Sequence, residues 1–198
     1  RGMSSAASDV YKRQQLDLEF EKENELKFSD YIQMIKYKTA VLLGSSLKMG
    51  GIINDVNETD LESLYDIGLN LGLAFQIQDD YLDLFGDQNL IGKKIGGDII
   101  KRKKTVMYHV FKEISNKDDS LTLDQLYNDS NSDDGSKIQK VFELFKNANV
   151  DVKTKDLVKN YSTKAINSLE NLNIVNDKKS ELIPVSYTHL TLPTTYHV

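Results

Sequence analysis

The sequence has no cysteine, only two prolines and only three histidines among its 198 residues. Without cysteine the chain can form neither a disulfide nor a thiolate metal site, and it has no cysteine nucleophile. A histidine-rich zinc site is excluded as well, because His189 and His197 lie in the last ten positions and only His109 is internal. Carboxylates remain as protein metal ligands, and oxygen ligands favour hard ions such as Mg²⁺ or Ca²⁺.

The chain also lacks an excess of positive charge and a long apolar run. The 25 Lys and Arg against 30 Asp and Glu give a formal net charge of −5, which argues against nucleic acid as a partner. The longest apolar stretch, 39–53, is interrupted by Lys48 and three glycines, so we expect no transmembrane segment. These features indicate a soluble protein, which we expect in the cytoplasm, and the length fits one domain.

The two ends of the chain differ from its middle. Residues 1–14 show neither apolar periodicity nor a signal-peptide layout, and residues 185–198 carry no acidic or basic side chain. Both stretches resemble translated sequencing-adaptor remnants; the alternative is an ordinary disordered terminus. We therefore predict non-native segments at 1–14 and 185–198 around one domain at 15–184, and we expect the chain to be a fragment of a longer protein.

The distribution of proline favours helices, because the first 183 residues contain none. A helix is predicted from Ser29 that gives way near Gly44 to a second, short one. A long helix is predicted to follow residues 57–60 and to run to Phe85, where a glycine ends it. Further helices are predicted at 103–114, 137–147 and 154–172. The predicted fold class is all-α.

Apolar residues recur in the long helix at alternating spacings of three and four, which is a heptad pattern. The seam consists of Leu61, Leu64, Gly68, Leu71, Phe75, Gln78, Leu82 and Phe85. Gly68 and Gly72 lie one turn apart. Because they lack side chains, they would let a neighbouring helix or a ligand approach closely.

The same helix carries an acidic stripe. At about 100° per residue, Gln76, Asp79, Asp80 and Asp83 share an arc of roughly 100°. Like charges at these spacings repel, and no Lys or Arg lies within a turn on that face, so a bound cation would stabilise the stripe. Mg²⁺ takes one or two carboxylates and keeps its other positions for water and phosphate. The alternative is a solvated acidic face in a chain with 28% charged residues.

A basic, glycine-containing loop follows the acidic stripe. Six cations occur between positions 93 and 104: Lys93, Lys94, Lys101, Arg102, Lys103 and Lys104. Lysines on a flexible loop beside carboxylates and Mg²⁺ are suited to hold diphosphate oxygens as point charges. The alternative for each is a plain surface lysine.

The motifs become specific when they are read in order. FQIQDDYLD (75–83), the Gly-Asp pair at 86–87 and GKKIGGDIIKRKKT (92–105) resemble the second aspartate-rich region of the trans-isoprenyl diphosphate synthases, the polyprenyl synthetase family. Upstream, YKTA (37–40) resembles the family's Lys-Thr helix, and QLDL (15–18) resembles the end of its Gly-Gln-x-x-Asp-Leu segment. The resemblance covers roughly residues 15–183 and implies an isoprenoid-synthase-type helical bundle, truncated at the N-terminal side.

The resemblance also implies roles for individual residues. Four carboxylates would form the Mg²⁺ site: Asp79, Asp80, Asp83 and Asp98. Three lysines would contact the substrate diphosphate: Lys38, Lys93 and Lys103. Three residues would be catalytic: Lys38, Thr39 and Gln76. The Lys38 backbone carbonyl and the side chains of Thr39 and Gln76 would point partial negative charge at the developing carbocation. Two would line the pocket: Asp17 and Phe75.

In the family reaction, metal and lysines stabilise the departing diphosphate of an allylic substrate. The double bond of isopentenyl diphosphate attacks the allylic cation, and the released diphosphate removes a proton. The reaction requires no nucleophilic residue, in agreement with the absence of cysteine. The resemblance thus implies a Mg²⁺-dependent transferase of isoprenoid biosynthesis, a homodimeric prenyltransferase that makes a farnesyl, geranylgeranyl or longer polyprenyl diphosphate.

The resemblance is incomplete at its N-terminal side. The family needs a first aspartate-rich motif and a nearby arginine pair before the Lys-Thr helix, and nothing before Gln15 contains them. We therefore expect this chain alone to be inactive. Two alternatives stay open, a non-catalytic subunit of a heteromeric prenyl diphosphate synthase and a plain helical interaction protein.

Overall fold

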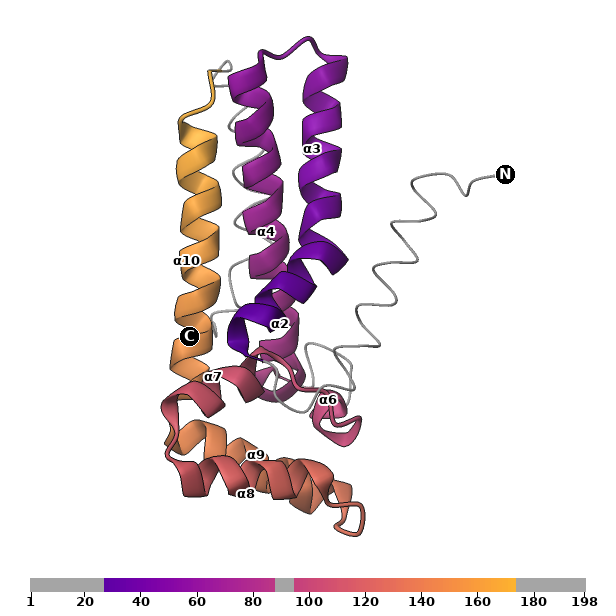
Figure 1. Ribbon diagram of the computed structural model, residues 1–198, viewed down its shortest axis with the longest axis vertical. Helices are drawn as coiled ribbons and strands as arrows, with labels where there is room; N and C mark the ends of the chain where they lie inside the picture. Colours follow the sequence, from indigo (N-terminus) through magenta and orange to yellow (C-terminus); the bar gives the residue numbers. More distant parts are fainter. Residues whose placement is uncertain (1–26, 88–94, 174–198) are drawn as a thin grey trace, which may run out of the picture. The chain divides into compact units, whose positions relative to one another are not determined.

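A computed structural model of the chain describes residues 27–87 and 95–173. Within these ranges the chain forms helices and turns with no strand, so the predicted all-α class is confirmed (Figure 1). No helix in the described ranges is both long enough and apolar enough to cross a membrane. The elements in chain order are α2 (Phe28–Ile35), the π-helical turn η1 (Lys36–Ala40), α3 (Val41–Ile53), α4 (Glu58–Phe85), α6 (Gly97–Ile100), α7 (Val106–Ile114), α8 (Lys117–Asn128), α9 (Asp134–Asn147) and α10 (Val150–Glu170).

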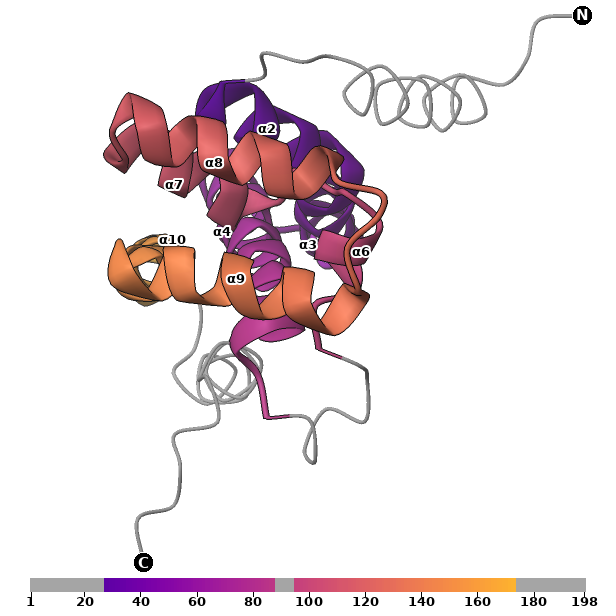
Figure 2. The same cartoon turned by 90° about the horizontal axis from the view of Figure 1, so that it is seen from below.

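The described residues divide into two compact units, and α4 and α10 contribute to both. The first unit contains residues 27–34, 79–87 and 95–155. In it, α8 and α9 run beside each other in opposite directions (Figures 1 and 2). The second unit contains residues 35–78 and 156–173, and α4 lies there between α3 and α10. The predicted segments 1–14 and 185–198 lie outside the described residues.

The first predicted helix begins at Phe28 and is not broken at Gly44, contrary to the sequence-based prediction. Helix α2, turn η1 and helix α3 follow one another without a gap, and the Val41 N–H donates to the Lys36 carbonyl, one residue further back than in an α-helix. Gly44 lies inside α3, where α4 packs so closely that position 44 has no room for a side chain. A Cβ there would lie 2.8 Å from the Tyr65 carbonyl oxygen.

The long helix α4 ends at Phe85, as predicted, but it begins at Glu58. Its start is earlier than predicted because the Asn57 side chain caps it, accepting the Asp60 N–H at 3.0 Å. The predicted heptad seam is only partly right, because Phe75 is 49% exposed. At about 100° per residue the buried residues of α4 lie on more than one side of the helix. The buried apolar residues of α4 include Leu61, Ile67, Ala74, Ile77, Tyr81 and Leu84.

In the second unit α4 packs against η1 and α3 backbone to backbone. A Cβ at Gly68 would lie 2.7 Å from the Cα of Gly44, and a Cβ at Gly72 would lie 2.5 Å from the Cα of Ala40. The prediction that these two glycines admit a close neighbour is thus confirmed, and the neighbour is a helix. A small core is also built in this unit from Ile67, Leu169 and Leu172, with Leu47, Leu64 and Leu71 packed against it.

Three downstream helices differ from the predicted bounds. Helix α7 begins at Val106 and not at residue 103, because Arg102 has a positive φ of 58° and Thr105 is extended, which keeps the preceding residues out of the helix. Helix α9 begins at Asp134, capped by the Asp133 side chain, and α10 begins at Val150. Helix α8 occupies a stretch for which the sequence analysis predicted no helix.

The close packing at Gly68 predicts a loss of stability in Gly68→Ala. The added methyl has no room beside the backbone of α3, and such overpacking costs about 1–3 kcal/mol of unfolding free energy. Gly50→Ala is the matched control, because its Cβ would meet nothing within 4 Å, and it is expected to stabilise α3 by up to ~1 kcal/mol. Urea unfolding followed by circular dichroism measures both variants. Shifts of the same sign would contradict the backbone contact.

Candidate functional site

The predicted site residues are distributed over both units, and each group is described within its own unit. In the first unit lie Asp79, Asp80, Asp83, Asp98 and Lys103, and in the second lie Lys38, Thr39, Phe75 and Gln76. Lys93 and Asp17 lie outside the described residues. Phe75, predicted to line the pocket, is about half exposed on α4.

Asp80 is buried and is held by two donors that are distant in the sequence. Its Oδ2 accepts the Tyr31 hydroxyl of α2 and the Val106 N–H, at 3.2 Å, at the start of α7. Burial, together with the charge of Asp80, holds the pKa of Tyr31 well above its usual value, so the hydroxyl remains a donor. Asp80 therefore ties α2, α4 and α7 together within the first unit. Neither Tyr31 nor Val106 was identified from the sequence, because a contact over 49 residues leaves no local pattern.

Asp79 and Asp83 lie one turn apart and differ from Asp80 in exposure. Asp79 is exposed and Asp83 is half-buried. The Asp83 Oδ2 accepts the Asp98 N–H at 3.0 Å, and its carbonyl accepts the Gly96 N–H at 2.6 Å. Burial raises the pKa of Asp83, and the negative charges of Asp98 and Asp79 add to this rise, against the opposing hydrogen bond from the Asp98 backbone and the charge of Lys103. Burial is thus the main reason why the charged form of Asp83 is disfavoured.

Lys103 forms an ion pair with Asp98. Its Nζ lies 2.8 Å from the Asp98 Oδ1, and its backbone N–H donates to the Asp98 carbonyl at 2.9 Å. The hydrogen bond that Lys103 donates to the Asp98 carboxylate raises the pKa of Lys103, and the charges of Asp98, Asp80 and Asp83 contribute to the rise. Arg102 takes the left-handed backbone conformation, and the chain turns back there so that Lys103 reaches Asp98. A predicted diphosphate ligand and a predicted metal ligand are therefore direct partners.

The carboxylates of the first unit can supply some, but not all, of the ligands of a metal ion. Within the described residues, no group of three or more His, Asp or Glu side chains is arranged to hold a metal. Mg²⁺ nevertheless requires only one or two protein carboxylates when phosphate oxygens complete its shell. The hard oxygens of Asp79 and Asp83, one turn apart on α4, fit an ion held jointly with a phosphate. They do not fit a metal bound by protein ligands alone.

In the second unit the structure brings Thr39 and Gln76 together. The Thr39 hydroxyl in η1 donates to the Gln76 Oε1 on α4 at 3.1 Å, and both side chains are partly buried. Gln76 lies one turn after Gly72, whose contact with Ala40 brings η1 against α4. Lys38, the neighbour of Thr39, is exposed. The π-helical turn that carries Lys38 and Thr39 was not predicted, although such turns are frequent at functional sites.

The buried contact at Asp80 predicts that Tyr31→Phe destabilises the protein by about 1–3 kcal/mol, because a buried carboxylate loses a donor. Tyr108→Phe is the matched control. The Tyr108 hydroxyl donates to Asp124 at 2.5 Å, but this partly exposed carboxylate also accepts Lys112 at 2.7 Å. We expect the control to lose about 1 kcal/mol or less in chemical denaturation. Equal losses would contradict a special role of the Asp80 contact.

Comparison with known sequences gives a consistent result. The family model described as Polyprenyl synthetase matches residues 1–145. A geranylgeranyl diphosphate synthase of Saccharolobus solfataricus is 34% identical over 165 residues, which cover 82% of this chain and 48% of that protein. A short chain isoprenyl diphosphate synthase of Methanocaldococcus jannaschii is 37% identical over 145 residues, covering 73% of this chain and 43% of that protein. The chain therefore spans about half the length of these curated relatives.

Solved structures show the same likeness. A crystal structure of a geranylgeranyl pyrophosphate synthase superposes with a TM-score of 0.86 and 38% identity, covering 94% of this chain and 58% of that one. The geranylgeranyl pyrophosphate synthetase of Pyrococcus horikoshii superposes with a TM-score of 0.84 and 30% identity, covering 95% of this chain and 56% of that one. The isoprenoid-synthase-type fold expected from the motifs is thereby confirmed.

Proposed function

The chain belongs to the polyprenyl synthetase family, and from this we propose that it acts in prenyl transfer. The reaction would condense isopentenyl diphosphate with an allylic diphosphate to form a polyprenyl diphosphate. The observation that supports this most directly is the carboxylate group of the first unit, in which Asp79 and Asp83 present oxygens near the ion pair of Asp98 with Lys103. Such a group suits a diphosphate bound together with a cation.

Asp79 and Asp83 would hold Mg²⁺, and Asp80 and Asp98 would support them. When bound, Mg²⁺ supplies charge that stabilises the departing diphosphate. Asp80 keeps the end of α4 in place through Tyr31 and Val106. The Asp98 backbone N–H orients the Asp83 carboxylate. In this assignment the four carboxylates divide into two ligands and two positioning residues.

Three lysines would bind the diphosphate: Lys38, Lys93 and Lys103. Lys103 is 49% exposed and remains charged beside Asp98, so its Nζ can also donate to a phosphate oxygen. Lys38 is exposed in η1, where it can also reach a ligand. As ammonium groups, these lysines act as mobile point charges and impose little geometry.

Thr39 and Gln76 would stabilise the carbocation. The Thr39 hydroxyl donates a hydrogen bond to the Gln76 oxygen, so the lone pairs of Thr39 remain available to an electron-poor carbon. The Lys38 carbonyl would add a third partial negative charge. Partial burial of both side chains limits competing water, which strengthens such electrostatic stabilisation.

A non-catalytic subunit of a heteromeric prenyl diphosphate synthase is the second candidate. The family reaction also needs a first aspartate-rich motif, to which the resemblance assigns no residue of this chain. Formation of a polyprenyl diphosphate from labelled isopentenyl diphosphate, an allylic diphosphate and Mg²⁺ separates the two functions once that motif is supplied. Binding of Mg²⁺ with diphosphate separates both from a plain helical interaction protein.

Three further proposals rest on the sequence analysis. They are a homodimeric assembly, a location in the cytoplasm, and a domain at 15–184 between non-native segments. Light scattering of the purified chain tests the first, and cell fractionation tests the second. Sequencing of the source DNA across both ends of the reading frame tests the third.

Asp79→Asn is expected to weaken the Mg²⁺-dependent binding of inorganic pyrophosphate at least about tenfold, because it removes a charged ligand oxygen. Isothermal titration calorimetry measures the affinity, and EDTA should abolish binding to the unchanged chain. Asp66→Asn is the matched control, since Asp66 is an exposed aspartate on the same helix. A tenfold loss in the control, or none in Asp79→Asn, would remove Asp79 from the site.

Lys103→Gln is expected to weaken pyrophosphate binding by an amount that shrinks as ionic strength rises, because salt screens an exposed charge. Titrations at about 0.05 and 0.5 M NaCl measure this dependence. Lys140→Gln, an exposed lysine on α9, should leave the affinity unchanged at both concentrations. A loss that is independent of salt would instead mean that Lys103 acts through packing.

A further inference from the structure

Arg102 has a backbone conformation that arginine rarely adopts. Three non-glycine residues in the described part of the chain have a positive φ: Asp55, Arg102 and Asn149. Asp and Asn tolerate this left-handed region because their short side chains can form local hydrogen bonds, whereas the long side chain of arginine does not. Glycine would occupy the position without strain. A strained residue of this kind indicates that its side chain contributes something that glycine would not.

The left-handed conformation of Arg102 gives the end of α6 the form of a Schellman motif. The Arg102 N–H donates to the Ile99 carbonyl at 3.0 Å, and the Lys103 N–H donates to the Asp98 carbonyl at 2.9 Å. Glycine is the usual residue at the position that Arg102 occupies in this motif. Because the chain folds back over α6, the Lys103 Nζ lies 2.8 Å from the Asp98 Oδ1. The ion pair of Lys103 with Asp98 therefore depends on the backbone conformation of Arg102.

The side chain of Arg102 is anchored on the turn between α8 and α9. Its guanidinium Nη2 donates to the Ser130 hydroxyl at 2.8 Å, a contact between residues 28 positions apart. The turn has hydrogen bonds of its own, because the Asp129 Oδ1 accepts the N–H groups of Asn131 and Ser132, at 2.8 and 3.3 Å. Ser130 lies inside this hydrogen-bonded turn, so its hydroxyl has a defined position.

Lys137 on α9 holds the same turn from the inside. It is buried, and its Nζ donates to the carbonyls of Tyr127 and Asp129 at 3.2 and 3.1 Å, where α8 ends. Burial lowers the pKa of Lys137, and the positive charge of Arg102 lowers it further. The Arg102 guanidinium thus lies close enough to influence a buried group of α9.

The other end of α6 is also fixed on α9. Gly96, which precedes α6, has a positive φ of 76°, and a Cβ there would lie 2.7 Å from the Ile138 Cγ1 on α9. Helix α6 is therefore held at its start by close packing and at its end by the Arg102 side chain. Between these two points lies Asp98, whose N–H donates to Asp83 and whose carboxylate pairs with Lys103.

We propose that Arg102 is a positioning residue for diphosphate binding. Its side chain, anchored on Ser130, stabilises the left-handed turn, and this turn places the Lys103 ammonium group beside Asp98. Arg102 thus acts through Lys103 and differs in role from the lysines of the same basic loop. The proposal rests on the proposed function, because it takes Lys103 to be a diphosphate ligand.

Hydrogen exchange of the Lys103 amide tests the turn without any ligand. Arg102→Ala and Ser130→Ala each remove one end of the anchor, so this amide should exchange at least about threefold faster in either variant. The double variant should exchange no faster than Arg102→Ala, since both changes remove the same bond. NMR of the isotope-labelled chain measures the rate. Unchanged exchange in the two single variants overturns the proposal.

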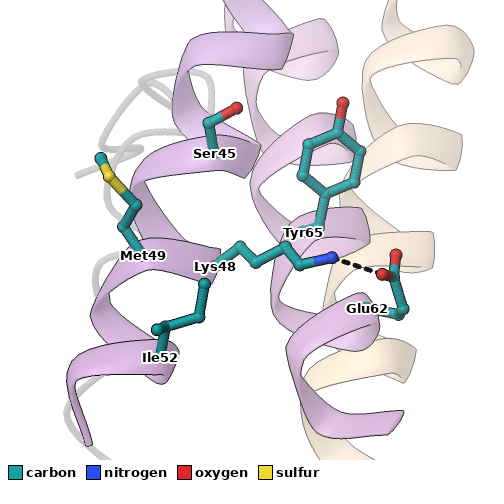
Figure 3. Close-up of a pocket in the computed structure, with 6 residues that line it drawn as sticks. All are labelled: Ser45, Lys48, Met49, Ile52, Glu62 and Tyr65. Carbon is teal, nitrogen blue, oxygen red and sulfur yellow. Dashed lines mark hydrogen bonds and ion pairs between the residues drawn. The ribbon is translucent and has the colours of Figure 1, made fainter. Parts of the chain in front are cut away.

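Lys48→Ala is the matched control for the loss of one cation that links two elements. Lys48 reaches from α3 to the Glu62 carboxylate on α4, across a groove that is also lined by Ser45, Met49, Ile52 and Tyr65 (Figure 3). It belongs to the second unit and has no contact with Ser130 or Lys103. The control should leave both the exchange of the Lys103 amide and the affinity for pyrophosphate unchanged.

The affinity for inorganic pyrophosphate in the presence of Mg²⁺ separates positioning from direct contact. Arg102→Ala should weaken binding at least about threefold, because the turn loses a hydrogen bond. Arg102→Gly lacks the same charge but favours the left-handed conformation, so it should recover most of this loss. In a chain that already carries Lys103→Gln, Arg102→Ala should have no further effect. Isothermal titration calorimetry measures all four affinities.

A direct contact between Arg102 and the diphosphate would give a different pattern. Arg102→Gly would then lose as much affinity as Arg102→Ala, and the loss would persist beside Lys103→Gln; either result overturns the proposal, as does an unchanged affinity in Arg102→Ala. A chain that binds no pyrophosphate contradicts the proposed function itself. In that case the exchange of the Lys103 amide still decides whether Arg102 holds the turn.

Discussion

The second unit depends on a contact between two helix backbones. Gly68 lies against Gly44, and Gly72 lies against Ala40, at distances that leave no room for another Cβ. One consequence is the hydrogen bond from Thr39 to Gln76, since Gln76 follows Gly72 by one turn. Another is the orientation of α3, whose glycine side faces α4 while large apolar side chains elsewhere on the helix are exposed. A packing contact without side chains thus positions polar residues and exposes apolar ones.

In the first unit the Asp80 carboxylate holds the helices together. Asp79 and Asp80 are neighbours in the sequence, yet Asp79 is exposed and Asp80 is buried among donors from α2 and α7. The rotation of about 100° between adjacent helical residues accounts for the difference. The carboxylates named from the sequence therefore differ in exposure and in hydrogen-bond partners. Repulsion among their charges is partly relieved by Tyr31 and Lys103.

A helix end that is set by neighbouring residues was predicted correctly. Two features set by contacts between residues distant in the sequence were not. The end of α4 at Phe85 was predicted because a glycine after an apolar run is a local signal. The break at Gly44 was wrong because the same local signal was overruled by a contact with Tyr65, distant in the sequence. Phe75 was placed in a heptad seam, but it is half exposed, because apolar periodicity does not show which side of a helix its neighbours cover.

The sequence by itself determined the chemistry that is available: hard oxygen ligands, cations on a following loop, no thiol, and motifs whose order identifies the family. These properties depend on residue types and on short spacings, which a helix preserves. Only the tertiary structure decided that Tyr31 holds Asp80, that Thr39 meets Gln76, and which side of α3 stays exposed. Each of these depends on how helices distant in the sequence pack together, and such packing has no signature in local periodicity.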